Sequence, residues 1–100
     1  MERNVSDALR VLDVSHLEPP EPLQQALAAI DSLTSGVCLC LLHRREPLLL
    51  YPILEQQGYD HLTCATPHAE NGVPAFRIYI WRRHDRRAEA TACQAVSQLP

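Results

Sequence analysis

Two short polar stretches contain the residue types that could bind a ligand. Their candidate residues are His16, Glu18 and Glu21 in the first stretch and His43, Arg44, Arg45 and Glu46 in the second. Imidazole and carboxylate groups could hold a divalent metal, for which His16 and His43 are the candidate ligands. The arginines, next to two expected helix N-termini, could instead bind an anion. A polar loop edge without a ligand is the third alternative, because loops are polar whatever their function.

The four cysteines could support sulfur or redox chemistry, but none stands in a pattern typical of a nucleophile. Cys38 and Cys40 lie two residues apart in an apolar run, so they share one face of a strand and are expected to be buried. Cys93, near the C-terminus, is the candidate exposed thiol. The chain has no G-x-S-x-G, H-E-x-x-H, Walker or dinucleotide-binding motif. We therefore assign no catalytic residue and expect no cofactor.

A stretch near the C-terminus alternates basic and aromatic side chains. The residues that would share one face of a strand are Arg77, Tyr79, Trp81 and Arg83. Such a face suits contact with a protein or with a second copy of the chain. It could also stack on the bases of a single-stranded nucleic acid, or be covered by the C-terminal segment. The net charge of −3 makes nucleic acid the least favoured of these partners.

The elements that position these residues follow from the periodicity of apolar side chains. Strands are expected over residues 9–14, 37–42, 59–66 and 75–83. The first helix begins at the prolines of residues 19–22 and ends at Gly36. The second spans residues 47–57, and because Pro52 removes a helical hydrogen bond, it either begins near Leu49 or is kinked.

This order is β-α-β-α-β-β. The β-α-β unit implies a parallel strand pair, and Asn71-Gly72 implies an antiparallel hairpin. We therefore expect an α/β fold of the α+β two-layer sandwich type, with a mixed four-stranded sheet and two helices on one face. Residues 1–83 would form this single domain, and residues 84–100 a C-terminal tail that is either a short helix or disordered.

The composition excludes several classes of function. All nine basic side chains are arginine, which excludes Schiff-base and P-loop chemistry, because both need a lysine amine. No stretch approaches the roughly 18 apolar residues of a membrane span, and the N-terminus lacks the apolar region of a signal peptide. We expect a cytoplasmic protein with reduced thiols, with a protein or small ligand rather than a membrane as partner, and we leave a homodimer open.

The segment from Leu12 to Leu23 resembles the opening of TusA- and SirA-type sulfur-transfer proteins. Those proteins read L-D-x-x-G-L-x-C-P-x-P, whereas this segment reads L-D-V-S-H-L-E-P-P-E-P-L. The likeness covers about residues 9–83 and implies a TusA-like fold. It is closer still to an uncharacterised bacterial branch of that superfamily, which has P-P-E-P-L at this place, a D-H-D-P-like turn and an L-L-Y-P-L-like helix. Residues 43–47 and 49–53 correspond to that turn and that helix.

Departures from these patterns at four positions bear on function. Pro19 stands at the position of the working cysteine and cannot hold a persulfide, and His16 replaces the usual glycine. Arg44 and Arg45 stand where the uncharacterised branch has aspartate and histidine. We therefore expect a non-enzymatic accessory or binding protein, which the resemblance places in a bacterial redox or sulfur-related pathway. A carrier that uses a displaced cysteine is the alternative, and single-stranded nucleic-acid binding through the last strand is the second alternative.

Overall fold

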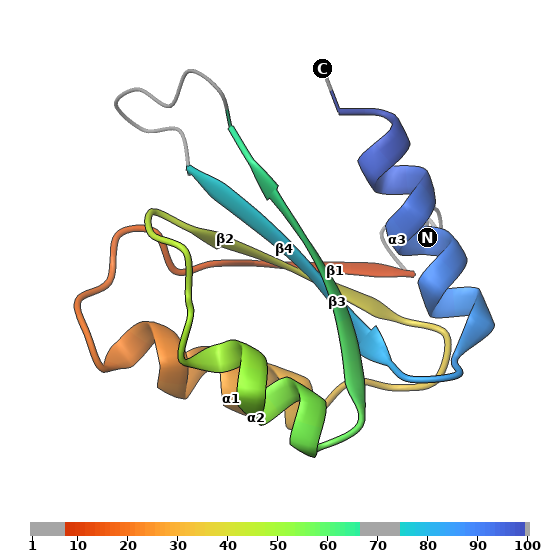
Figure 1. The fold of residues 1–100 in the computed structure, drawn as a ribbon, viewed down its shortest axis with the longest axis horizontal. Helices are drawn as coiled ribbons and strands as arrows, with labels where there is room; N and C mark the ends of the chain where they lie inside the picture. Colours follow the sequence, from red (N-terminus) through yellow and green to blue (C-terminus); the bar gives the residue numbers. More distant parts are fainter. Residues whose placement is uncertain (1–7, 67–74, 100) are drawn as a thin grey trace, which may run out of the picture.

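The computed structural model of the chain describes residues 8–66 and 75–99, so the expected turn at Asn71-Gly72 lies outside the described residues. The elements are β1 (Leu9–Asp13), α1 (Glu21–Asp31), β2 (Cys38–His43), α2 (Leu50–Gln56), β3 (Tyr59–Ala65), β4 (Phe76–Arg82) and α3 (Arg86–Ser97). The predicted order of the first six elements is confirmed, and α3 follows them (Figure 1). Among the described residues, no helix has the length and apolar character needed to cross a membrane.

The four strands form one mixed sheet in the order β1-β2-β4-β3, which confirms the predicted sheet. β1 and β2 are parallel, with Leu9 beside Cys38. β4 is antiparallel to both of its neighbours, with Ile80 paired to Leu39 of β2 and to His61 of β3. The outer strands are therefore β1 and β3, and the carboxyl ends of the parallel pair meet at one edge of the sheet.

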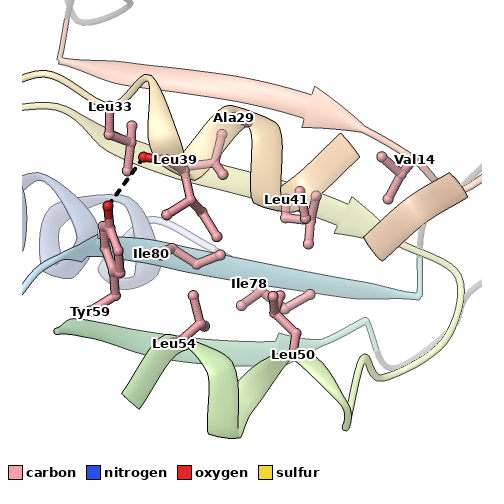
Figure 2. Packing of buried hydrophobic residues seen from close by; sticks show 12 residues of the cluster. Val14, Ala29, Leu33, Leu39, Leu41, Leu50, Leu54, Tyr59, Ile78 and Ile80 are labelled. Atoms are coloured by element: carbon pink, nitrogen blue, oxygen red, sulfur yellow. Dashed lines mark hydrogen bonds between the residues drawn. The ribbon is translucent and has the colours of Figure 1, made fainter. Parts of the chain in front are cut away.

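Helices α1 and α2 cover one face of the sheet, as predicted (Figure 1). Alternate residues of β2 and β4 point toward these helices, because side chains of a strand alternate between its two faces. The core on this side contains Leu39, Leu41, Ile78 and Ile80 from the sheet and Ile30, Leu50 and Leu54 from the helices. Figure 2 shows this packing, together with the Tyr59 hydroxyl that donates a hydrogen bond of 3.3 Å to the Ile30 carbonyl.

Helix α3 covers the opposite face and adds a third layer to the expected sandwich (Figure 1). Its residues Ala88 and Ala92 are fully buried in a second cluster, with Cys38, Tyr79 and other side chains of the sheet. The segment after β4, for which the sequence left a short helix or disorder open, is thus a packed helix. Asp85 caps it by accepting a hydrogen bond of 3.1 Å from the Ala88 N–H.

The start of α2 and the end of α1 follow from local chemistry. α2 begins at Leu50, so Pro52 falls in the first turn, where its missing N–H has no helical partner to lose. Of the two alternatives for this helix, the later start is therefore the one found. The expectation that Gly36 ends α1 is wrong, because α1 ends at Asp31 and Gly36 lies in the turn before β2. There its φ of +83° suits glycine, and its N–H donates to Asp85 over 2.8 Å.

Candidate functional site

An apolar pocket of about 400 Å³ lies between the start of α1 and the β2–α2 loop. Pro19, Pro20 and Pro22 contribute one wall, and residues 47–50 contribute another. The two walls meet here because both connections leave the carboxyl ends of the parallel strands β1 and β2. The pocket therefore lies at the edge of the sheet where the sequence predicted a site.

The lining of this pocket runs from the hydrophobic core to solvent. Leu41 and Leu50 line it and are fully buried, whereas Leu48 and Leu49, which also line it, are 66% and 77% exposed. Adjacent exposed leucines beside a hollow are unusual on a protein surface and are typical of a place that contacts an apolar group. The pocket thus offers continuous apolar surface to an incoming molecule.

The polar side chains of the pocket are His43, Arg45 and Glu46. The Arg45 N–H donates to His43 Nδ1 over 3.2 Å, so the proton of the neutral imidazole is on Nε2. Partial burial of the ring, with the positive charges of Arg44 and Arg45, lowers the pKa of His43. His43 is consequently a neutral donor through Nε2–H at neutral pH.

Glu46 and Arg45 differ in the partners that their side chains have within the protein. Glu46 accepts a hydrogen bond of 3.1 Å from the Tyr51 hydroxyl, which also lies 2.7 Å from the Thr63 hydroxyl of β3. The Tyr51 ring stacks on His61 with ring centroids 4.4 Å apart. Within residues 8–66 and 75–99, no carboxylate pairs with the Arg45 guanidinium. Arg45 is therefore the positive group that remains available at the pocket.

The remaining predicted site residues lie beside the pocket or away from it. Arg44 forms an ion pair of 3.0 Å with Glu18 and does not line the pocket. His16 and Glu21 are exposed and do not line it either. Among the described residues, no three His, Cys, Asp or Glu side chains are placed to hold a metal ion together. The structure thus brings three of the seven predicted residues, His43, Arg45 and Glu46, into one hollow.

A family model described as Uncharacterized conserved protein (DUF2249) matches residues 11–82 of the chain. The chain belongs to this family. The DUF2249 match runs from within β1 to the end of β4, so it contains the whole pocket and stops before α3. Comparisons with curated proteins and with solved structures gave no match.

The sequence did not predict the apolar walls of the DUF2249 pocket. Their signal was present in the prolines of residues 19–22 and in Leu48 and Leu49, which follow a polar turn where polar side chains are the rule. In the sequence pattern, consecutive leucines after a proline indicate the beginning of a helix. Only the packing of this loop against the first turn of α1 turns them into a pocket wall.

The basic and aromatic face of β4 is not a free surface. Tyr79 and Trp81 are only 3% and 4% exposed and lie in the cluster beneath α3. Arg77 is half-buried, and Arg83 reaches β3, where it pairs with Asp60 over 3.4 Å. The prediction that this face contacts a partner is thus corrected for Tyr79 and Trp81. The C-terminal helix covers them, which is the third alternative that the sequence left open, and they cannot stack on bases in this conformation.

Three cysteines of this DUF2249 chain, Cys38, Cys40 and Cys64, lie in the layer between the sheet and α3. Burial raises the pKa of Cys38 to about 12 and also raises the pKa of Cys40, so both stay protonated at neutral pH. Cys64 is half-buried and Cys93 is exposed. A displaced sulfur-carrying thiol would therefore have to be one of these last two.

Proposed function

We propose that this DUF2249 protein is a non-enzymatic binding protein whose pocket takes a small molecule with an apolar body and one acidic end. The observation that carries the proposal is the composition of the pocket, in which apolar walls meet one available guanidinium, that of Arg45. Its volume of about 400 Å³ falls in the range of small-molecule sites, about 300–1,000 Å³.

The polar groups of the pocket define the ligand's headgroup. Arg45 can donate two parallel hydrogen bonds to a carboxylate, and neutral His43 donates through Nε2–H. Glu46 already accepts a hydrogen bond from Tyr51, and its negative charge repels a second negative charge on the ligand. These groups therefore favour a monoanionic acid over a neutral molecule or a dianion.

The likeness to TusA-type proteins supports a place in a sulfur-related pathway of the bacterial cytoplasm. In those proteins a cysteine at this position of the L-D-x-x-G-L-x-C-P motif carries the sulfur, and here the position is Pro19, which lines the pocket. A nucleophilic cysteine is thus replaced by a proline that forms part of the apolar wall of the pocket. We infer that the chain holds its ligand without a covalent bond at the place where the resembled proteins carry sulfur.

Binding of octanoate, followed by chemical-shift perturbation in ¹⁵N spectra, tests this function, with 1-octanol as the uncharged comparison. Octanoate is expected to shift the amides of residues 43–46 and 48–50 and to bind more tightly than 1-octanol. Arg45→Ala should weaken octanoate about fivefold, the equivalent of ~1 kcal/mol for a solvent-screened charge pair, and leave 1-octanol unchanged.

Arg44→Ala is the matched control, because Arg44 pairs with Glu18 and does not line the pocket. This variant should bind octanoate like the wild type. Equal weakening by the two arginine variants, or equal affinity for octanoate and 1-octanol, would show that the acidic end is not recognised. Shifts confined to residues outside the pocket would overturn the site itself.

A further inference from the structure

The two outer strands of the sheet differ in how their edges are protected. β1 has five residues, and two of them, Arg10 and Asp13, are charged. β3 has seven residues, and its single carboxylate, Asp60, is paired with Arg83 of β4. Short, charged edge strands discourage pairing with another chain, whereas long and nearly uncharged ones permit it. β3 is therefore the edge at which a further strand could be added.

The backbone groups that β3 offers to a further strand follow from its ladder with β4. Arg83 donates its N–H to the Gly58 carbonyl, and Thr66 donates to the Ala75 carbonyl. Hydrogen-bonded pairs recur at every second residue of an antiparallel ladder, so residues 60, 62 and 64 bond to β4. The N–H and C=O groups of Tyr59, His61, Thr63 and Ala65 consequently point outward. The Tyr59 carbonyl accepts a hydrogen bond of 3.4 Å from the Arg83 guanidinium, and within residues 8–66 and 75–99 no hydrogen bond uses the outward groups of the other three residues.

There is space along this edge, lined by both apolar and charged side chains. A hollow of about 540 Å³ crosses β3 from α2 to α3, with Pro52 on one side and Cys93 on the other. Leu62, which also lines it, is 38% exposed and projects from the middle of the strand. Figure 1 shows β3 as the outer strand between these two helices.

From this geometry we propose that β3 pairs with β3 of a second copy of the chain, in antiparallel register about a two-fold axis at Leu62. Leu62 is the midpoint of Tyr59–Ala65, so this register pairs all seven residues. His61 then lies opposite Thr63 of the second copy, and the outward backbone groups of both strands meet. A shift by one residue would place outward groups opposite groups that already bond to β4.

The side chains of β3 fit this self-pairing. The two Leu62 side chains meet at a non-hydrogen-bonded position, where facing side chains approach most closely. Asp60 lies opposite Cys64 of the second copy, so no like charges face each other. The two four-stranded sheets become one sheet of eight strands across the axis. An edge so complementary to itself favours a second copy over a strand of unrelated sequence.

Sedimentation velocity of the full chain at increasing concentration tests the proposal. The wild type is expected to move from the chain mass of 11.3 kDa toward twice that mass as its concentration rises. Leu62→Lys places two positive charges at the axis and should raise the dissociation constant at least about tenfold. Val11→Lys is the matched control, because Val11 is a 61% exposed hydrophobic residue of the other outer strand, and it should leave the dimer unchanged.

Disulfide trapping gives a second measurement that does not depend on a destabilising change. Leu62→Cys in a Cys93→Ser background is treated with diamide, which takes up the two thiol hydrogens as the disulfide forms. Facing residues at this position have Cα atoms about 4.5 Å apart, within the range that a disulfide spans. The expected product is a covalent dimer joined through the two introduced thiols, identified by mass spectrometry of the linked peptides.

Three results would overturn the proposal. In the first, the wild type stays monomeric up to millimolar concentration. In the second, Val11→Lys weakens the dimer as much as Leu62→Lys does. In the third, Val11→Cys in the Cys93→Ser background gives as much covalent dimer as Leu62→Cys does. A disulfide that joins the introduced thiol to Cys64 of the second copy would overturn the two-fold at Leu62, because it shows another register.

Discussion

The two faces of the sheet are packed with different kinds of side chain. Branched aliphatic residues from both strands and helices fill the face under α1 and α2. The face under α3 is filled by cysteines and aromatic residues of the sheet, and the helix contributes mainly the small side chains of Ala88 and Ala92. Alanine buries far less apolar area than leucine or isoleucine, so α3 gains less from packing than α1 and α2 do.

The two faces also differ in how well their polar atoms are satisfied. On the α1 and α2 face, the buried Tyr59 hydroxyl donates to the Ile30 carbonyl. On the α3 face, Trp81 Nε1 is buried without a hydrogen-bond partner, the one such side-chain atom in the described part of the chain. An unsatisfied buried donor costs about 1–3 kcal/mol. We therefore expect α3 to open before the α1 and α2 layer, while the rest of the domain stays folded.

The largest expected effect is on the α1 and α2 face. Leu39 is fully buried, and Leu39→Ala should lower the free energy of unfolding by about 2–5 kcal/mol, because it leaves a cavity. Urea denaturation followed by circular dichroism measures this loss. Cys38→Ala is the matched control, since Cys38 is the adjacent, equally buried residue on the α3 face, and its loss should be much smaller. If Cys38→Ala lowers the free energy of unfolding as much as Leu39→Ala does, the two faces do not differ in their packing in this way.

A smaller loss of stability is expected when a larger side chain disturbs the packing of α3 on the sheet. Ala92 has no exposed surface, and Ala92→Leu overfills the cluster beneath the helix, at a cost of about 1–3 kcal/mol. Cys38 and Cys40 should then react faster with a thiol reagent, with the native circular dichroism retained. Ala90→Leu, at an exposed position of the same helix, should change stability by no more than about 0.5 kcal/mol. Unchanged thiol reactivity in Ala92→Leu would mean that α3 does not control access to this layer.

The smallest effect concerns the cap of α3. The N–H groups of Gly36 and Ala88 donate to Asp85 and lower its pKa. Because the pKa is lower in the folded state, this stabilisation is fully present above the unfolded pKa of about 4 and is lost as the pH falls through the folded value. Asp85→Ala should cost about 0.5–2 kcal/mol at neutral pH and remove this part of the pH dependence.

Hydrogen exchange of the α3 amides between pH 7 and pH 3 measures the cap's contribution. The wild type should lose protection in α3 below about pH 4, and Asp85→Ala should show weak protection throughout. Asp13→Ala is the control, because hydrogen bonds from Ser15 also lower the pKa of Asp13, which lies at the end of β1. An equal effect of Asp13→Ala on the α3 amides would assign the pH dependence to the whole domain rather than to the cap.

The sequence predicted the sheet and its two-helix face because their signals are local. The apolar run of β2 and the alternation in β4 are visible in any short window. The role of α3 was not visible, because Ala88 and Ala92 differ little from the exposed Ala90 in a hydropathy pattern. What distinguishes them is the cluster against which they pack, and part of that cluster, Cys38 and Cys40, lies about 50 positions away in the sequence.

The candidate site was predictable as a place more than as a set of residues. The crossover rule brought the loops after β1 and β2 to one edge of the sheet, and the structure confirms this. Which side chains line the pocket depends on distances between loops. Arg44 and Arg45 are neighbours in sequence, yet Arg44 pairs with Glu18 and only Arg45 lines the hollow. A sequence pattern contains no information that separates these two outcomes.

The phenol of Tyr51 lies between the two surfaces for which we propose partners. Its hydroxyl contacts Glu46 at the pocket and Thr63 at the outer edge of β3, and its ring stacks on His61. If a pocket ligand displaces Glu46, the hydrogen bonding of Tyr51 to the strand that forms the edge must change as well. Ligand binding and self-association would then be thermodynamically linked, and each would alter the affinity of the other by the same factor.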